Sequence, residues 1–214
     1  MSGVAIHTAA KNGDISTLTS LINSNASLDL QDLFDFTPIH WAALEGHHDV
    51  VQVLVDAKAS LDVQERSGYT PLHHAAKRGH RDALQVLVDA KANVDVQDVG
   101  GCFPLHRAAQ NGHGDVVQLL VDAKAAFDTG DDRNASLLLS SAVSGDLASI
   151  QSLLGKDANV NAGDAVIQAT SLHIAAMCGH NDVLRVLVDA KASVDSQDSS
   201  GYTAMHWAAM CGHN

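Results

Sequence analysis

The sequence predicts an all-α protein of stacked helix-turn-helix units, and three regularities support this fold class. Seven positions recur every 33 residues, with one residue inserted before the sixth: His7, His40, His73, His106, Leu139, His173 and His206. A glycine series keeps the same register: Gly13, Gly46, Gly79, Gly112, Gly145, Gly179 and Gly212. Around these markers each unit shows a helical signal, a tight turn, a second helical signal and a polar loop. Two series locked in register indicate a repeated structural unit.

The composition is typical of a folded chain with a core of small and aliphatic side chains. Hydrophobic residues make up 46% of the sequence and charged residues 18%, which lies in the globular range. Aromatic residues amount to only 4%, so Val, Leu and Ala must fill most of the core. Such a core favours helices that pack closely.

Residues 32–64 illustrate how one unit begins. Thr37 can cap a helix, and Pro38 has the fixed backbone angle and the missing donor that suit the first helical position. The predicted buried face of this helix is narrow and consists mostly of small residues: Ile39, Ala42 and Ala43. Gly46 is expected to end the helix.

The second helix of this unit is expected to be capped by Asp49 and to end at Lys58. Its apolar face recurs at helical spacing: Val50, Val51, Leu54 and Val55. Gln52 and Asp56 then point to solvent. The segment 60–69, SLDVQERSGY, is rich in turn residues and predicts a hairpin-like finger before the next Thr-Pro.

The pattern Thr-Pro-Leu-His-x-Ala-Ala at this spacing resembles the ankyrin repeat. The strongest instances are TPIHWAALEGHHDVVQVLV, TPLHHAAKRGHRDALQVLV, FPLHRAAQNGHGDVVQLLV and TSLHIAAMCGHNDVLRVLV. The resemblance implies a solenoid of L-shaped units, with two layers of helices and fingers that line a concave surface. It makes the chain a single ankyrin-repeat domain of about seven repeats, the last incomplete: 1–31, 32–64, 65–97, 98–130, 131–164, 165–197 and 198–214.

One departure from the family pattern lies just after the second helix, where the family usually has a left-handed Gly. The residues at this position are Asn25, Lys58, Lys91, Lys124, Asp157 and Lys191. Asn and Asp tolerate the left-handed conformation, whereas Lys costs on the order of 1 kcal/mol, partly offset by its charge near the helix end. The fold is expected to survive this cost.

Repeat five departs further, because Ser136, Leu137 and Leu139 replace the usual motif after the irregular stretch 128–134. Local loosening is expected there. The sequence stops at Asn214, where the second helix of repeat seven would begin. Such a helix would contribute roughly 6 to 12 kcal/mol through about four buried side chains, so we expect a piece of a longer protein.

Thirteen histidines raise the alternative of metal binding or general-base chemistry, with pairs such as His40 and His47 as conceivable ligands. The repeat explains eleven of them better, because they recur at two fixed positions, the motif position and the position beside the interhelical glycine. The family resemblance assigns the motif position to hydrogen bonds between fingers and helices. Only His48 and His74 fall outside the pattern, and both are expected at the surface; no metal is predicted.

The three cysteines lack the spacing of a disulfide framework or of a zinc site. Cys178 and Cys211 are expected on adjacent repeats about 10 Å apart, too far for a disulfide without backbone movement. A reducing compartment, the cytoplasm or the nucleus, is therefore predicted.

Charge and missing motifs argue against other functional classes. Twenty-five acidic residues against thirteen basic ones give a net charge of −12, which disfavours a nucleic-acid partner. No apolar run reaches the roughly 18 residues of a membrane span, so no membrane insertion is expected. No phosphate-binding loop, carboxylate pair or nucleophile elbow is present, so we expect no catalytic residues, no cofactor and no small-molecule ligand.

The positions free to vary are the finger tips and the exposed side of the first helices, and these form the candidate protein-binding set. Repeat two contributes aromatic and apolar residues: Leu33, Phe34, Phe36, Trp41 and Leu44. Repeats three and four contribute a polar, partly basic centre: Arg66, Tyr69, His74, Lys77, Arg78 and Arg107. Repeats six and seven contribute Ile174, Met177, Tyr202, Trp207 and Met210. Trp41 and Phe34 are the expected anchor, although Phe34 and Phe36 could instead pack the first finger against repeat one.

The predicted function is binding of another protein, as an adaptor or scaffold without catalysis. The alternative is a targeting or regulatory region of a larger enzyme, such as a kinase or a ubiquitin ligase, with its catalytic domain beyond Asn214. A purely structural spacer is a third possibility, because the near-identical VLVDAKA segments indicate recent duplication. The fold class does not decide between these functions.

Overall fold

The computed structural model describes residues 2–123 and 133–213. The chain forms two compact units, unit 1 (residues 1–107) and unit 2 (residues 108–214), each of which is described by itself. Lys124 and residues 128–132 lie outside the described residues, so the expectations of a left-handed lysine and of local loosening there stay predictions.

The described residues form thirteen α-helices: α1 (Ser2–Asn12), α2 (Ile15–Asn23), α3 (Pro38–Glu45), α4 (His48–Asp56), α5 (Pro71–Arg78), α6 (Arg81–Asp89), α7 (Pro104–Gln110), α8 (Gly114–Asp122), α9 (Arg133–Ser144), α10 (Leu147–Leu154), α11 (Ser171–Cys178), α12 (Asn181–Asp189) and α13 (Ala204–Met210). Apart from an isolated bridge between Gly163 and Thr170, these ranges contain no β-structure. The predicted all-α fold class is confirmed. None of the described helices combines the length and the apolar composition that crossing a bilayer requires.

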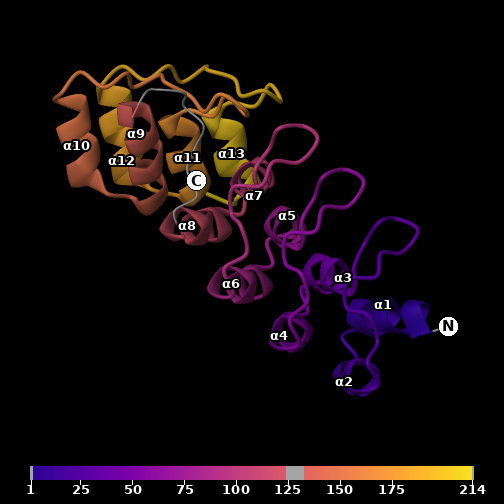
Figure 1. Ribbon diagram of the computed structural model, residues 1–214. Coiled ribbons are helices and arrows are strands. Elements are labelled where there is room, and N and C mark those ends of the chain that lie inside the picture. Colours follow the sequence, from indigo (N-terminus) through magenta and orange to yellow (C-terminus); the bar gives the residue numbers. More distant parts are fainter. Residues whose placement is uncertain (1, 124–132, 214) are drawn as a thin grey trace. The chain divides into compact units, whose positions relative to one another are not determined.

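Unit 1 is built from helix pairs in two layers. The first helices of the pairs, α1, α3 and α5, pack side by side, and the second helices, α2, α4 and α6, form the layer behind them (Figure 1). Six of the predicted core positions of α3 and α4 are buried, and Val55 is only half-buried. The six are Ile39, Ala42, Ala43, Val50, Val51 and Leu54. Small side chains on α3 allow its neighbours to approach closely.

Four of the first helices, α3, α5, α11 and α13, begin after a threonine at the cap position. The Thr70 hydroxyl accepts a hydrogen bond from the backbone N–H of His73, and Pro71 takes the first position of α5. The second helices differ from the prediction. Helix α4 begins at His48 with His47 at the cap position, so Asp49 lies in the first turn and does not cap the helix. Its negative charge there still favours the positive end of the helix dipole.

Gly46 ends α3 in the left-handed conformation, with φ at 78°. A Cβ atom at this position would come within 2.7 Å of the ring of His80 in the next repeat. Glycine is therefore required twice, by the backbone turn and by the stacked imidazole. The glycine series of the sequence records both the turn and the close stacking of successive repeats.

The residue after each second helix adopts the predicted left-handed conformation wherever it is described. The backbone φ is 69° at Lys58 and at Lys91 and 68° at Lys191, and it is also positive at Asn25 and Asp157. The lysines carry a Cβ atom in this conformation, which costs on the order of 1 kcal/mol each.

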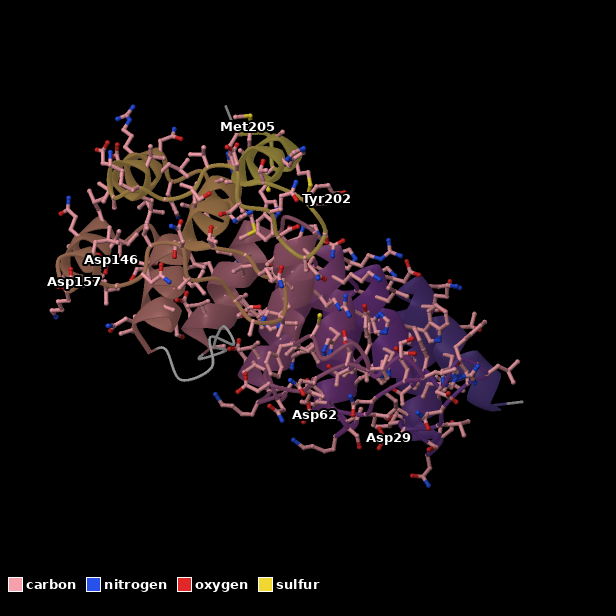
Figure 2. The ribbon with its side chains drawn as sticks, turned by 90° about the horizontal axis from the view of Figure 1, so that it is seen from above. Asp29, Asp62, Asp146, Asp157, Tyr202 and Met205 are labelled. Atoms are coloured by element: carbon pink, nitrogen blue, oxygen red, sulfur yellow. The ribbon has the colours of Figure 1, made fainter. Side chains whose placement is uncertain are left out.

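Polar side chains at the base of the fingers connect neighbouring repeats in unit 1. Asp29 accepts hydrogen bonds from the backbone N–H and the hydroxyl of Ser60, at 2.8 and 2.7 Å. Asp62 accepts one from the backbone N–H of Asn93 at 2.9 Å. Asp29 and Asp62 follow one another along one edge of the unit (Figure 2). This ladder fixes the spacing of the fingers.

In unit 2, α11 is the central helix and contacts α8, α9, α12 and α13. Repeat five forms a helix pair, α9 and α10, although it lacks the usual motif. Leu138 and Leu139 supply fully buried side chains to this pair. Asp146 caps α10 by accepting a hydrogen bond from the backbone N–H of Ser149 at 3.1 Å. Aliphatic burial and an acidic cap therefore replace the missing motif.

Replacing Lys58 by Gly should stabilise unit 1 by about 0.5 to 1 kcal/mol, because Gly removes the left-handed penalty. The measurement is urea denaturation followed by Trp41 fluorescence, with Trp207 replaced by Phe so that only unit 1 reports. Lys58→Ala is the matched control, since Ala keeps the Cβ atom and should give no gain. An equal effect of Gly and Ala would contradict the assigned strain.

Candidate functional site

The motif histidines join each first helix to the finger that follows it. In α3 and α5 the histidine Nδ1 accepts a hydrogen bond from the threonine backbone N–H three residues earlier, at 3.1 Å in both cases. The Nε2–H then donates to a backbone carbonyl 29 residues later. These pairs are His7 with Phe36, His40 with Tyr69, His73 with Cys102 and His173 with Tyr202, at 3.0, 3.2, 3.1 and 3.0 Å. The structural role expected for these histidines is confirmed.

The second histidine series points the other way along the chain. His47 and His80 donate through Nε2 to the carbonyls of Lys11 and Leu44, at 3.0 and 3.1 Å. Each carbonyl belongs to the last turn of the preceding first helix, where it has no partner within its own helix. Two histidine series thus connect every described repeat of unit 1 to its neighbours.

Burial favours the uncharged form of three motif histidines, His40, His73 and His173. Desolvation lowers the pKa of His40 to about 4, and it also lowers the pKa of His73 and of His173. A neutral imidazole can accept at Nδ1 and donate at Nε2 at the same time, which both hydrogen bonds require.

The described part of the chain contains no group of three or more His, Cys, Asp or Glu residues placed to hold a metal ion. Its cysteines, Cys102, Cys178 and Cys211, form no disulfide with one another. Burial raises the pKa of Cys178 to about 12, so this thiol is protonated at neutral pH. Such a thiol is a poor nucleophile.

Unit 1 contains a groove of about 460 Å³ that brings together eight of the predicted binding residues. Repeat two contributes Phe34, Phe36, Trp41 and Leu44. Repeat three contributes Arg66, Tyr69, His74 and Lys77, together with Glu65 and Ser67. We call this feature the aromatic groove. Leu33, Arg78 and Arg107, also predicted to bind, lie outside its lining.

Trp41 is held in place at the aromatic groove. Its indole N–H donates to the carboxylate of Asp32 at 2.8 Å, and its ring lies 4.8 Å from the ring of Phe36 between centroids. Lys11 places its ammonium 4.3 Å from the centre of the indole. Phe34 meets the same indole edge to face at 6.5 Å. Phe34 is therefore an exposed ring set against an ordered partner.

Tyr69 occupies the basic part of the aromatic groove. Lys77 and Arg107 each place their charge 5.3 Å from the centre of the Tyr69 ring. Arg107 is fixed by Asp98, whose carboxylate lies 2.7 Å from its guanidinium. Arg66 pairs with Asp35 at 3.2 Å and stays largely exposed. The cations are thus positioned by aromatic rings and by neighbouring carboxylates.

Acidic residues inside the fingers shape these turns. The Asp32 carboxylate accepts from the backbone N–H of Phe34 and of Phe36, and the Glu65 carboxylate accepts from those of Ser67 and Tyr69. Burial would raise the pKa of Asp32, but the hydrogen bonds from Trp41 and from the backbone outweigh it and lower that pKa. We call Asp32, Glu65, Asp98, Asp164 and Asp198 the turn acids.

The turn acids were missed as positioning residues at the sequence level. A turn acid and the residue nine positions later form the pairs Asp32 and Trp41, Asp98 and Arg107, and Asp198 and Trp207. The signal was present in the sequence, because three of the turn acids, in repeats two to four, are spaced 33 residues apart. The same position of the first helix, nine residues after the turn acid, therefore carries an indole in two repeats and a guanidinium in one, and the turn acid accepts a hydrogen bond from each.

The expectation that His74 lies at the surface was wrong. Its side chain is only 7% exposed and packs against the rings of Phe36 and Tyr69, at 4.8 and 5.2 Å between centroids. Its Nε2 has no hydrogen-bond partner. Burial is the main cause that lowers its pKa to about 3, and the positive charges of Lys77 and Arg78 act in the same direction. His74 forms part of the floor of the groove.

The other predicted residues of unit 1 retain the exposure that binding requires. Leu33 is 89% exposed and Phe34 is 63% exposed, and the polar heads of Arg66, Lys77 and Arg78 also face solvent. Phe36, Trp41, Leu44, Tyr69 and Arg107 are half-buried. Val99, at the finger tip of repeat four, is a large exposed apolar residue that was not predicted.

In unit 2, three predicted binding residues, Ile174, Met177 and Trp207, are buried. Ile174 and Met177 are buried because α11 is covered by helices α8, α9, α12 and α13. Trp207 is only 2% exposed, donates to Asp198 at 2.8 Å and lies 5.6 Å from the His173 ring. Tyr202 and Met210 are exposed, as is Met205, which was not predicted. Tyr202 and Met205 are labelled on unit 2 in Figure 2.

The sequence model that describes ankyrin repeats matches three overlapping segments, residues 6–98, 92–164 and 137–214. The chain belongs to the ankyrin-repeat family. Ankyrin repeats are generally protein-protein interaction modules and typically non-catalytic. No curated protein sequence matches this ankyrin-repeat chain.

The burial of His74 in this ankyrin-repeat protein predicts that the folded state becomes less stable as the pH is lowered. His74 has an ordinary pKa of 6.5 and a folded pKa of about 3, so the unfolded state binds more protons between these values. The contribution of His74 to the free energy of unfolding is therefore fully present above about pH 6.5, and it is lost as the pH falls below this value. At pH 5 this single group destabilises unit 1 by about 2 kcal/mol.

The substitution His74→Ile should remove that part of the acid sensitivity, and the same slot already holds Ile174 in repeat six. Urea denaturation of unit 1 at pH 7.5 and at pH 5, read by Trp41 fluorescence in the Trp207→Phe background, measures the difference. The wild type should lose about 2 kcal/mol more than the variant over this interval. Equal losses would show that His74 is not buried in its neutral form.

Proposed function

We propose that this protein is a non-catalytic recognition module and that the aromatic groove of unit 1 binds a partner protein. The proposal rests on one observation above all: large apolar side chains face solvent on a finger whose backbone is held by hydrogen bonds. Leu33 and Phe34 are largely exposed, while the finger that carries them is held by Asp32 and by His7. Exposed apolar residues grouped beside a groove are typical of interaction sites.

The frame supports recognition because it is ordered before a partner arrives. Trp41 is fixed by Asp32 and by Phe36, so little side-chain freedom is left to lose on binding. Aromatic and arginine side chains are the residues that dominate binding energy at interfaces. The groove offers both kinds, with Trp41 from repeat two and Arg66 from repeat three.

The chemistry of the groove favours binding over catalysis. Glu65 is buried and accepts two backbone hydrogen bonds, and His40 and His73 are engaged at both ring nitrogens. These groups support the fold and are not poised to transfer protons. The proposal includes an adaptor or scaffold role in a reducing compartment, the cytoplasm or the nucleus, in which cysteines stay unoxidised.

The test is a double substitution, Phe34→Asp with Leu44→Asp, which places two charges at the apolar end of the groove. A partner captured from cells by the wild-type chain, identified and purified, should bind the variant at least about tenfold more weakly by calorimetry, a loss of roughly 1.4 kcal/mol. Both residues lie outside the fully buried core, so the helical circular dichroism should remain unchanged.

Val194→Asp is the matched control, because Val194 is an exposed apolar residue of unit 2 that lies outside the groove. It should leave the partner's affinity unchanged. If the groove variant retains full affinity, or if Val194→Asp weakens binding equally, the aromatic groove is not the binding site.

A further inference from the structure

We infer that the aromatic groove selects an extended acidic peptide, with one large apolar side chain and a carboxylate about three residues away. This inference rests on the proposed function and names the chemistry of its partner. It comes from the residues that line the groove. Repeat two supplies apolar and aromatic side chains, which we call the apolar end, and repeat three supplies Arg66 and Lys77, which we call the cationic end. The carboxylate in the lining, Glu65, is buried.

The apolar end accepts the anchor side chain. Phe34 and Leu44 flank the indole of Trp41, and Phe36 closes the floor against His74 at 4.8 Å between centroids. The carboxylate of Asp32 is occupied by the indole N–H and by two backbone N–H groups. A docked aliphatic or aromatic side chain would therefore meet rings and methyl groups.

The cationic end is the part that fits a carboxylate. Arg66 and Lys77 line it, and the Lys77 ammonium lies 5.3 Å from the centre of the Tyr69 ring. The side chain of Arg66 is 72% exposed. Its guanidinium keeps donors for a ligand, since five N–H groups exceed the bonds that it makes to Asp35 and to the carbonyl of Leu33.

The carboxylate in the lining does not cancel this charge at the surface. Glu65 is only 8% exposed, and its two oxygens accept the backbone N–H groups of Ser67 and Tyr69. The cations of the groove project into solvent while this anion faces the finger turn. A carboxylate of the ligand can thus approach Arg66 and Lys77 more closely than Glu65. Its attraction to the two cations is therefore stronger than its repulsion from Glu65.

The spacing follows from the packing of the two repeats. Helices α3 and α5 lie side by side, and packed helices are about 8 to 10 Å apart. An extended chain rises about 3.3 Å per residue, so it crosses from one repeat to the next in about three residues. The net charge of −12 repels acidic ligands at long range, but this repulsion is screened beyond about 8 Å in physiological salt.

The experiment uses a random peptide library displayed on phage as the probe, selected on the full chain. Selected peptides should share a Phe, Leu, Ile or Met with an Asp or Glu two to four residues away. Synthesised peptides should bind in fluorescence anisotropy and should lose about tenfold in affinity for Arg66→Glu with Lys77→Glu. Lys58→Glu with Lys91→Glu is the matched control, because it changes the net charge equally but lies outside the groove.

Three outcomes would overturn the inference, and they separate it from the proposed function. If the selected peptides depend on Phe34 and Leu44 but are neutral or basic, the groove is still a binding site, but the inference of an acidic partner is wrong. Peptides that bind equally well to the Phe34→Asp, Leu44→Asp variant would reject both. A library without groove-dependent peptides would reject the peptide chemistry, while capture of the cellular partner would still decide the proposed function.

Discussion

The structure depends on buried, neutral imidazoles that each bridge two repeats. In α3, Nδ1 of His40 accepts from the Thr37 backbone while Nε2–H donates to the carbonyl of Tyr69, so one side chain closes the helix start and holds the next finger. The second histidine series connects a repeat to the preceding one. His80 donates through Nε2 to the carbonyl of Leu44, and its ring packs against Gly46. An unpaired buried carbonyl would cost about 1 to 3 kcal/mol, so each bridge is strongly favoured once formed.

This frame explains how a chain of nearly identical units can present a distinctive surface. Three of the turn acids, Asp32, Asp98 and Asp198, orient the residue nine positions later, which is an indole at Trp41 and Trp207 and a guanidinium at Arg107. The finger tips differ in side chain from repeat to repeat, with Leu33 in repeat two and Arg66 in repeat three. In the proposed function, recognition rests on residues whose backbone is already fixed, which lowers the entropy lost on binding.

The regular part of the fold could be predicted because helix caps, glycine turns and histidine bridges are local and repeat in the sequence. The candidate site was predicted only in part. Trp41 and Trp207 share a slot and the same aspartate contact, yet Trp207 is buried, and His74 is covered by Phe36 and Tyr69. Burial of a slot depends on which side chains of neighbouring repeats lie over it, and the pattern within one repeat does not contain that information.

In α1, α3, α5 and α11 a histidine of defined tautomer connects the helix to the next finger. The most direct measurement is a long-range ¹H–¹⁵N NMR spectrum of the imidazoles at pH 7, with His40 assigned by its loss in a His40→Gln variant. The account predicts a single neutral His40 ring protonated at Nε2, because Nδ1 accepts from Thr37 and Nε2 donates to Tyr69. A ring protonated at Nδ1, or one that exchanges between charged and neutral forms at this pH, would contradict it.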